Sequence, residues 1–476
     1  MTNIKEILDN NENIKILKQV GSLGDKLSIS TYLVGGYVRD LLLGKKTKDV
    51  DIMVDKESLS FAKKLSKELK VNKTVEFEKF LTARIPHKKF EIEIANAREE
   101  SYNRKSRNPN IVKETTINQD LSRRDFTINC LAVSLNKNNF GQLIDSFNGI
   151  IDLNNKLIKT PLHPDETFKD DPLRMIRAIR FATQLQFKIE KNTLQAIKNN
   201  KDRIKLVSTE RITSELFKIL ESDQPSIGFY LIDECNLTEY VFPELTTMKG
   251  VEIIDNKGHK DVFIHTLEVV DNAAKLTKDM KVRFSALVHD IAKPATKRFD
   301  KKKGWTFHGH DEIGRRMLTK TAKRMKLSNE LKEYLMLLTK LHLRPIALAK
   351  KDISDNAIRR LMYEAGEHVD DLMILCRADI TTKNPHKIKK YLNNFERVEQ
   401  LMKDVAMRDE MRAFQSPVDG NKIMETLDLK EGKKVGKIKK DIENAILDEV
   451  IPNTYEDAFA YMMKIKEYLV RRQPIK

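Results

Sequence analysis

A stretch near the N-terminus, from Tyr32 to Val54, constrains the fold of this 476-residue chain more than any other feature. A short apolar run ends at Gly35-Gly36, where the backbone can turn sharply and approach a ligand closely. The apolar spacing then predicts a helix over 38–43 with Gly44 as its C-cap. The pattern predicts a strand, a tight turn and a short helix, with a second strand to follow.

Two aspartates define that second strand. Asp49 and Asp51 alternate with Val50 and Ile52, which is the period of a β-strand, so both carboxylates point to one face. Adjacent carboxylates repel each other unless a cation lies between them, and Mg²⁺ prefers hard oxygen ligands. The glycine turn and the helix N-terminus offer backbone N–H groups to a phosphate. Together these features predict metal-assisted nucleotidyl transfer; the alternative is a solvated strand edge after a turn.

A second polar motif lies between Asp120 and Ala132. Its spacing predicts that Arg123, Arg124 and Asp125 open a helix. Arginine side chains suit phosphate oxygens because their donors form a planar fork. Asn129, further along the motif, is a candidate ligand for a ribose hydroxyl.

A third motif opens the helical part that begins near residue 165. Pro172 suits the first helical position, and Asp171 suits the N-cap. Asp171 and Arg174 are three residues apart, so on a helix they present an acceptor beside donors. Cytosine and adenine each show an amino donor next to a ring-nitrogen acceptor, whereas uracil and guanine show the reverse order. This pair therefore favours selection of C and A, with ordinary helix capping as the alternative.

Histidines concentrate further along, because six of the ten lie between His259 and His342. Imidazole and carboxylate groups that converge from separate helices form metal sites able to activate water. The alternative is a purely structural domain with core histidines. The predicted ligands of a divalent transition metal or Mg²⁺ are His265, His289, Asp290 and Asp379, and the candidates for a second ion are His308, His310 and His342.

Charge and composition bound the partners and the compartment. Lysine and arginine number 87 against 70 acidic residues, a net charge of +17, which favours a polyanionic partner. The three cysteines lie far apart and read as core residues. No long apolar run is present, and residues 1–20 lack the apolar segment of a signal peptide, so we expect a cytoplasmic protein without membrane contact. The sequence carries no signal for the oligomeric state.

The first motif identifies a family. Gly35-Gly36 with Arg39-Asp40, followed by Asp49-x-Asp51, resembles the signature of the class II tRNA nucleotidyltransferase and poly(A) polymerase family, whose head is of the polymerase-beta type. The resemblance implies that the two aspartates bind the catalytic Mg²⁺ ions. It also implies that the glycine turn and Arg39 hold the triphosphate. Glu93 matches a third acidic residue of the family, and Glu91 on the same strand face is the alternative.

Later motifs extend the resemblance. The run from Arg123 to Cys130 resembles the family's R-R-D-F-T-x-N-A, with cysteine in place of alanine. Asp170-Asp171-x-x-Arg174 resembles the E-D-x-x-R motif credited with selecting C and A, and Arg177 and Arg180 follow on the same helix as candidate nucleotide ligands. The run 210–215 resembles an E-R-x-x-x-E helix that braces the site. The H…H-D…D pattern resembles the HD phosphohydrolase superfamily.

These motifs together predict an α+β protein with four parts. They are a nucleotidyltransferase head (1–150) with a mixed sheet, an all-α neck (151–250), an HD domain (251–400) and a helical tail (401–476) that is a candidate tRNA contact. The expected activity is addition or repair of the 3′-terminal CCA of tRNA from CTP and ATP. The alternatives are a poly(A) polymerase, an enzyme adding only C or only A, an HD phosphohydrolase with a nucleotide-binding head, and a non-catalytic RNA-binding protein.

Overall fold

The computed structural model describes residues 3–46, 49–71, 73–87, 90–102, 109–255, 257–349, 354–409 and 416–470. The chain forms two compact units, Met1–Thr247 and Met248–Lys476. Among the described helices, none combines the length and the apolar character needed to cross a membrane. Thr47 and Lys48, which precede the aspartate pair, lie outside the described residues.

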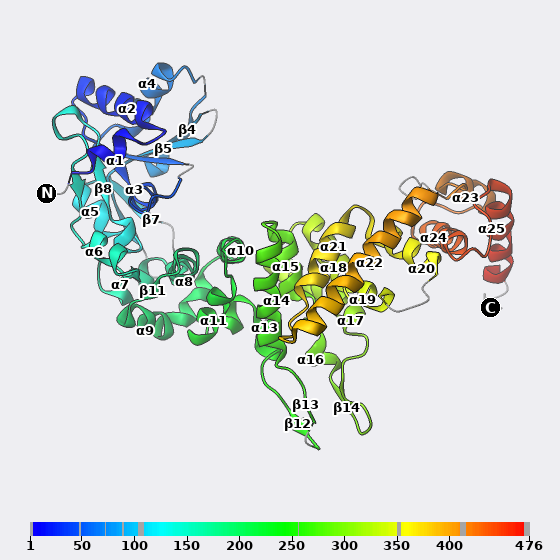
Figure 1. The fold of residues 1–476 in the computed structure, drawn as a ribbon. Coiled ribbons are helices and arrows are strands. Elements are labelled where there is room, and N and C mark those ends of the chain that lie inside the picture. Colours follow the sequence, from blue (N-terminus) through cyan, green and yellow to red (C-terminus); the bar gives the residue numbers. More distant parts are fainter. Residues whose placement is uncertain are drawn as a thin grey trace. The chain divides into compact units, whose positions relative to one another are not determined.

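The head is built on a seven-stranded sheet of order β3-β4-β5-β2-β1-β8-β9 (Figure 1). Strands β2 and β5 pair in parallel and their neighbours pair antiparallel, so the predicted mixed sheet is confirmed. The strands are β1 (Thr31–Val34), β2 (Val50–Val54), β3 (Val75–Phe77), β4 (Thr82–Pro86), β5 (Glu91–Asn96), β8 (Ala132–Ser134) and β9 (Leu143–Ile144), and a separate hairpin pairs β6 (Arg98–Tyr102) with β7 (Pro109–Glu114).

The two faces of this sheet carry different layers. The main core, which includes Val50 and Ile52, lies on the face covered by the helices α2 and α4. A smaller cluster that includes Met53 and Cys130 lies on the other face. Because alternate residues of β2 go to opposite faces, Asp51 shares the face of Met53. The head helices are α1 (Lys5–Asp9), α2 (Ile14–Leu27), α3 (Gly36–Leu42), α4 (Ser58–Glu68), α5 (Ile117–Ser122) and α6 (Gly149–Asn154).

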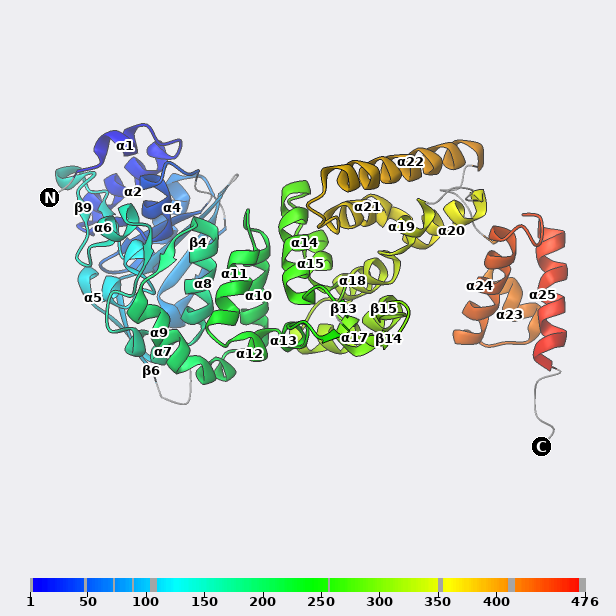
Figure 2. The ribbon, with the colours of Figure 1, turned by 60° about the horizontal axis from the view of Figure 1, so that its bottom comes forward.

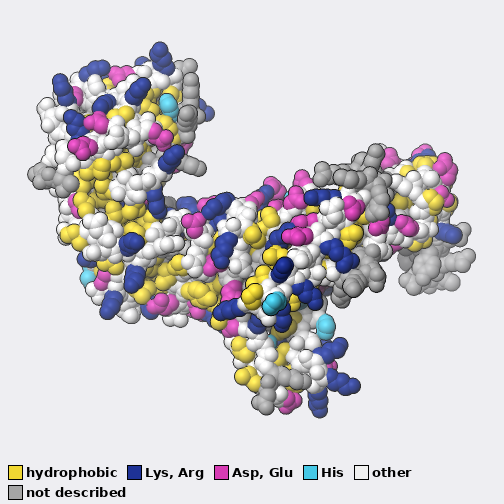
Figure 3. Space-filling model, viewed as in Figure 1, with side chains coloured by type: hydrophobic (Ala, Val, Ile, Leu, Met, Phe, Trp, Pro, Cys, Tyr) yellow, Lys and Arg dark blue, Asp and Glu magenta, His cyan; other side chains and the backbone are white. Residues whose placement is uncertain are grey.

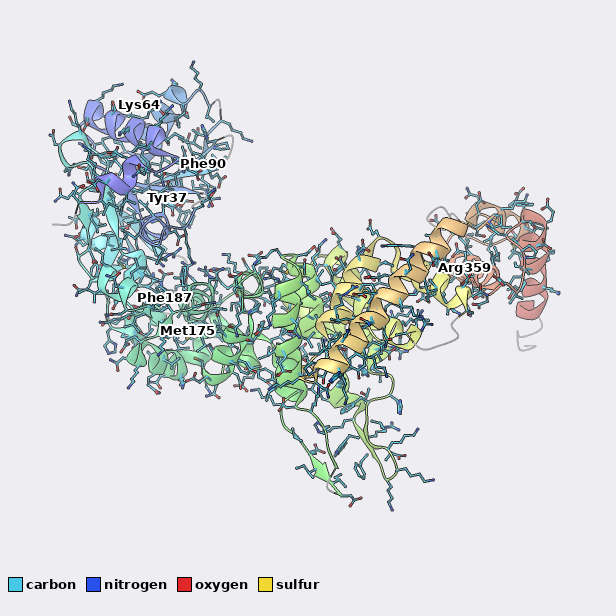
Figure 4. The ribbon with its side chains drawn as sticks, viewed as in Figure 1. Tyr37, Lys64, Phe90, Met175, Phe187 and Arg359 are labelled. Carbon is cyan, nitrogen blue, oxygen red and sulfur yellow. The ribbon has the colours of Figure 1, made fainter. Side chains whose placement is uncertain are left out.

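Hydrogen bonds of a buried tyrosine hold helix α3 in place. Tyr37, which is 2% exposed, donates its hydroxyl to Asn11 Oδ1 at 2.8 Å and accepts from Asn13 Nδ2 at 3.1 Å (Figure 4). Both asparagines belong to the connection between α1 and α2. This buried polar contact holds the helix that follows the glycine turn.

The neck continues the first unit as a group of helices. Met175 and Phe187 mark its buried core at α8 (Figure 4). It is not wholly helical, because β10 (Leu157–Ile158) and β11 (Lys188–Ile189) form a short parallel pair. The helices are α7 (Pro164–Asp170), α8 (Leu173–Leu185), α9 (Lys191–Asn200), α10 (Thr209–Leu220), α11 (Ser226–Glu234), α12 (Thr238–Val241) and α13 (Pro243–Thr247).

Helices dominate the second unit, and side-chain caps fix the start of several of them. Asp261, Asp279 and Ser328 accept hydrogen bonds from the first turns of α14, α15 and α18. The long helix α22 packs against α19, α20 and α21 (Figure 2). The helices are α14 (Val262–Leu276), α15 (Met280–Val288), α16 (Lys293–Thr296), α17 (His310–Met325), α18 (Asn329–Leu341), α19 (Arg344–Leu348), α20 (Asp355–Ala365), α21 (Val369–Ala378) and α22 (Pro385–Asp409).

This unit also departs from the all-α expectation. Two small antiparallel pairs interrupt the helices, β12 (Ile253–Ile254) with β13 (Lys257–Gly258) and β14 (Arg298–Asp300) with β15 (Gly304–Thr306). The turn between β14 and β15 carries three consecutive exposed lysines, 301–303 (Figure 3). A hairpin forms here because Gly304 has a φ of +78°, which suits a tight turn.

The tail forms a small helical cluster with its own core. Its helices are α23 (Gly420–Leu427), α24 (Lys433–Leu447) and α25 (Tyr455–Val470). Arg359 of α20 contacts Glu449 at 2.7 Å (Figure 4), and Arg360 contacts Asp448 at 3.3 Å. These ion pairs connect the tail to the rest of the second unit.

Candidate functional site

The floor of the candidate site is the parallel pair of β2 and β5. Asp51 lies directly opposite Glu93 in register, and Val50 and Ile52 are buried in the main core. Asp49 immediately precedes β2 and lines the same cavity as Asp51. The strand period predicted from the sequence therefore brings the two aspartates together.

The environment of Asp51 favours a cation. Burial, together with the nearby Glu93 and Asp49, raises the pKa of Asp51 to about 6. Three carboxylates on one sheet face create negative charge that a divalent metal would neutralise, and all of their donors are hard oxygens. The residues present thus fit a divalent metal ion.

The two candidate glutamates of β5 differ in position. Glu93 faces Asp51, and its carboxylate contacts Arg84 at 3.0 Å. Glu91 is more remote, with its side chain 50% exposed and only its backbone N–H near Asp49, at 3.5 Å. Neither glutamate is among the residues that line the cavity. The register favours Glu93, whose predicted catalytic role stays a prediction.

The glycine turn makes room for an arginine. Gly35 has a φ of +69°, and a Cβ added there would lie 2.6 Å from Arg124 Nη1. Arg39 is held on two sides, because it donates twice to Asp40 at 2.8 Å and once to Asn129 Oδ1 at 2.8 Å. The guanidinium groups of Arg39 and Arg124 are therefore held beside the turn, and both line the cavity.

The motif at 123–130 differs from its predicted form. Arg123 caps the end of α5, and Arg124 and Asp125 follow it, so these residues do not open a helix. The helix starts earlier because Thr116 and Gln119 form a capping box. The Asp125 carboxylate then accepts from its neighbour's N–H and from Asn129 Nδ2, both at 2.9 Å, which stabilises a turn.

Arginines of α8 pair with buried carboxylates. Arg177 contacts Asp125 at 2.6 Å, and Arg180 contacts Glu215 of α10 at 2.5 Å. Burial raises the pKa of Asp125, but Arg177 and Asn129 outweigh it and lower that pKa to about 2. Both arginines, with Arg39, lie over the ring of Phe181.

The candidate base-reading pair is held in place by other arginines. Asp171 contacts Arg211 of α10 at 2.8 Å and also accepts from the Leu173 N–H at 3.1 Å. Arg174 donates to the backbone carbonyl of Arg123 at 2.6 Å. Asp171 was predicted as the N-cap of α8, but it ends α7 and Pro172 is the N-cap, although the Asp171 carboxylate accepts from the first residue of α8. The Asp171 side chain also lines the cavity.

These groups share one cavity of about 750 Å³. Every residue predicted to bind nucleotide lines it, together with Asp49 and Asp51. The E-R-x-x-x-E motif predicted only a bracing role for Arg211, yet this residue also lines the cavity. The sequence had offered no other signal for the further lining residues. Lining residues that it did not single out as ligands are Arg98, Asp120, Phe181, Arg211 and Lys218.

The second unit gathers its histidines and aspartates at helix ends. His265 Nε2 lies 3.0 Å from Asp379 and 3.4 Å from Asp290, and His289 Nε2 lies 3.1 Å from Asp290. His310 Nε2 lies 3.4 Å from the other oxygen of Asp290 and 3.3 Å from His342 Nε2. Two groups of possible metal ligands result, His265–His289–Asp379 and Asp290–His310–His342.

Backbone contacts orient the buried histidines. The Nδ1 atoms of His289, His310 and His342 lie 2.7–2.8 Å from backbone carbonyls, so each Nε2 faces the centre. His289 Nε2 and both oxygens of Asp290 are buried and form no hydrogen bond of good geometry, although His289 Nε2 and Lys293 Nζ lie 3.1 Å and 2.5 Å from Asp290 Oδ2. Burying such atoms is costly unless a ligand satisfies them. The residues therefore fit one or two metal ions bridged by Asp290.

The charged groups of this centre lie close together and therefore shift one another's pKa values. Burial lowers the pKa of His289, but Asp290 and Asp379 outweigh it and raise that pKa to about 10. Burial and the neighbouring His289 lower the pKa of His342 to about 4. The carboxylates of Asp290 and Asp379 therefore favour positive charge on His289.

Two sequence inferences about this centre need adjustment. His308 is exposed and belongs to neither ligand group, whereas His310, two residues later, begins α17 and is buried. Lys293 was not singled out, yet its Nζ lies 2.5 Å from Asp290 Oδ2. The sequence did indicate this contact, because Lys293 follows Asp290 by three residues and residues at that spacing lie close together in a helical turn.

Three family models match the chain in the same order as these sites. The poly A polymerase head domain matches residues 31–159, and the model described as a probable RNA and SrmB-binding site of polymerase A matches 186–249. The HD domain matches 262–383. Both domain types generally use divalent metals, in agreement with the two sets of ligands.

Known proteins extend the match over most of the chain. A multifunctional CCA protein of Shewanella frigidimarina is 31% identical over 76% of this chain and 86% of its own length. A solved tRNA nucleotidyltransferase, complexed with a primer tRNA and an incoming ATP analog, is 25% identical with a TM-score of 0.58 and covers 80% of this chain and 99% of its own. The fold of a Thermotoga maritima CCA-adding enzyme, 21% identical with a TM-score of 0.59, covers 98% of this chain and 99% of its own. The chain therefore belongs to the family of CCA-adding tRNA nucleotidyltransferases and poly(A) polymerases, and it carries an HD domain.

Proposed function

We propose that this chain adds or repairs the 3′-terminal C-C-A of tRNA, using CTP and ATP and releasing pyrophosphate. The observation that carries the proposal is the meeting of three groups in one cavity, the carboxylates of Asp49 and Asp51, the arginines and the Asp171–Arg174 pair. The named relative and the nucleotidyltransferase solved with tRNA and an ATP analog support it.

The chemistry at the floor follows from the aspartates. Mg²⁺ ions held by Asp49 and Asp51 would supply the positive charge that activates the tRNA 3′-hydroxyl and neutralises the leaving pyrophosphate. Glu93 acts beside them by keeping the site negative enough to attract cations. Its contact with Arg84 limits that charge and fixes its position.

The wall binds the triphosphate. The glycine turn offers backbone N–H groups at the start of α3, and Arg39, Arg123 and Arg124 neutralise phosphate oxygens. Arg39 and Arg124 are already positioned by Asp40 and Asp120, so little side-chain entropy is lost when the nucleotide binds. Asn129 is placed to bind the ribose, because its amide already bonds to Arg39 and Asp125.

Base choice rests on the edge formed by Asp171 and Arg174. Arg211 holds the Asp171 carboxylate and the Arg123 carbonyl holds the Arg174 guanidinium, so the acceptor and the donors keep fixed places. A base with the reverse donor–acceptor order would leave these polar groups unpaired, which is costly. Arg177 and Arg180 support this edge through their carboxylate partners.

The test uses purified full-length chain and tRNA lacking its terminal C-C-A, with each NTP alone and with CTP and ATP together. We expect two C residues from CTP, one A after them, and no incorporation from UTP or GTP. Long A tails with CTP ignored would support poly(A) synthesis, and addition of C alone or A alone would support a partial enzyme. No addition under any condition would contradict the proposal.

A second function has its own observation. Six candidate ligands converge in the HD domain, and the charged side chains of His289 and Asp290 are buried against each other. This arrangement supports a metal-dependent phosphoester hydrolase. Metal ions held there would supply the charge that activates water and stabilises the transition state. We infer that this centre hydrolyses phosphorylated RNA 3′ ends. With a 2′,3′-cyclic phosphate, water would attack phosphorus and break the P–O3′ bond, which leaves a free 3′-hydroxyl and a 2′-phosphate.

This second function is tested with 2′,3′-cyclic AMP and Mg²⁺, Mn²⁺, Ni²⁺ or Co²⁺ in turn, for the wild type and for Asp290→Ala. Hydrolysis that requires one of these metals and is lost in the variant is the expected result. If no metal supports hydrolysis and none is found by elemental analysis, the domain serves a structural or RNA-docking role.

A further inference from the structure

A large cavity adjoins the HD centre and is not explained by the metal ligands. It has a volume of about 1090 Å³, and His265 and Asp379 lie in its wall. This volume is above the range of roughly 300–1,000 Å³ that is usual for small-molecule sites. A substrate larger than the reacting phosphate and its ribose can therefore enter beside the metal ligands.

The wall of this cavity is strongly basic. Among the described residues that line it, Asp379 is the only carboxylate. Lys293 also contacts Asp290 at 2.5 Å, and Lys260 contacts Thr381 Oγ1 at 3.2 Å. The lining cations are Lys260, Lys293, Lys387, Lys390 and Arg397.

One face of α22 supplies the outer part of this wall. Lys387, Lys390, Tyr391 and Asn394 line the cavity at intervals of three and four residues, so they share one side of the helix. Within the described part of the chain, neither lysine forms an ion pair with a carboxylate. Tyr391 is 41% exposed, so a planar ligand can reach its ring.

The spacing of these charges exceeds the size of one phosphate. Lys387 and Arg397 are ten residues apart on α22, which corresponds to about 15 Å along the helix axis at 1.5 Å per residue. A positively charged groove that contains an exposed aromatic side chain is typical of sites for single-stranded nucleic acid. The phosphates would track the cations while a base stacks on the tyrosine.

We propose that this face of α22 binds the strand upstream of the reacting phosphate, so that the HD centre acts on phosphorylated ends of RNA strands in preference to free mononucleotides. The inference rests on the proposed hydrolase function of the HD domain. It assigns binding to Lys387, Lys390 and Tyr391, and it assigns no chemical step to them.

The first test compares substrates that share one reacting end. These are 2′,3′-cyclic AMP and a pentaribonucleotide that ends in an adenosine 2′,3′-cyclic phosphate. We expect the wild type to have a kcat/KM about tenfold higher for the pentamer, through a lower KM. Lys387→Gln/Lys390→Gln and Tyr391→Leu should remove most of this preference, whereas Lys389→Gln, which changes the same charge outside the cavity, should keep it. Equal kcat/KM values for the two substrates in the wild type would overturn the proposal.

A second readout does not depend on hydrolysis. The full chain is treated with an acetylating reagent with and without a pentaribonucleotide carrying a 3′-phosphate, and the lysines are compared by mass spectrometry. The proposal expects protection of Lys387 and Lys390 but not of Lys389. Equal acetylation of all three would overturn it, and this holds even if no metal supports hydrolysis, in which case the hydrolase function fails separately.

Discussion

The head cavity and the HD centre differ in how their candidate residues would hold metal ions. In the head, the proposed ligands are two aspartates on one strand face, surrounded by arginines that already have carboxylate partners. In the HD domain, six ligands converge, and His289, Asp290, His310 and His342 are buried. Nucleotide phosphates can complete the first site, because Mg²⁺ usually keeps open positions for substrate. The candidate ligands of the second site are already oriented without substrate, because backbone carbonyls hold three of its imidazoles.

This difference indicates whether each site would bind its metal ion with its substrate or before it. An open pair of carboxylates depends on the triphosphate for tight metal binding, so metal and nucleotide arrive together. A set of oriented imidazoles would hold its metal ion independently, so its substrate would meet a preformed centre. The two sites therefore respond differently to loss of a ligand, to removal of metal and to pH.

Reciprocal inactivation is the largest expected effect. Asp51→Ala should lower nucleotide addition by about 10³-fold or more, because it removes several kcal/mol of transition-state stabilisation. Asp290→Asn should lower phosphoester hydrolysis by a similar factor. Each variant should retain the other activity within about twofold, measured by tRNA extension and by cyclic phosphate hydrolysis. Loss of both activities in either variant would contradict the separation of the two sites.

Metal retention should separate the sites next. After gel filtration without added metal, we expect the wild type to retain about two transition-metal ions per chain in the HD domain, with none held at the head. His342→Ala should lower the content to about one ion, and the exposed His308→Ala should leave it unchanged. Elemental analysis measures these contents, and equal loss of metal in both variants would exclude the second ligand group.

Base discrimination is a smaller effect and concerns the head alone. Asp171→Ala should raise UTP and GTP incorporation relative to CTP and ATP by about tenfold or more, because the reverse-order bases no longer face an unpaired carboxylate. Arg211→Gln should act in the same direction but more weakly, since it only releases Asp171. Competition assays with mixed NTPs measure both. An Asp171→Ala enzyme with wild-type preference would show that this residue only supports the start of α8.

The smallest effect is on stability. The pKa of Asp51 is raised from 3.8 to about 6, so the folded state disfavours its charged form. This cost is absent below about pH 4, grows as pH rises to about 6, and is full above that. Asp51→Asn should therefore raise Tm by a few degrees at pH 8 without Mg²⁺ and by little at pH 4. Thermal unfolding measures this, and an equal shift at both pH values would assign it to packing instead.

Local patterns were sufficient to predict much of this molecule. The period-two alternation around Asp51 fixed its strand and its face, and the apolar spacing located most helices. The resemblance of several motifs then predicted the order of head, neck and HD domain. The clustering of histidines predicted that His265, His289, Asp290 and Asp379 lie together, whereas the structure places Asp290 in a second group with His310 and His342.

Contacts between distant residues set the rest. The motif at Arg123 was expected to open a helix, but the capping box at Thr116 and the buried turn of Asp125 decided otherwise. The pairing of Asp171 with Arg211 spans forty residues and no local pattern shows it. Likewise, the local sequence does not distinguish His308 from His310. Only His310 is buried, because helix α17 begins there.

The most direct measurement is a structure of the full chain with tRNA ending in C-C and a non-hydrolysable ATP analogue. The account predicts the triphosphate against Arg39 and Arg124, the tRNA 3′-hydroxyl near Asp49 and Asp51, and the adenine edge facing Asp171 and Arg174. A triphosphate bound outside this cavity, or an adenine edge turned away from Asp171, would contradict it.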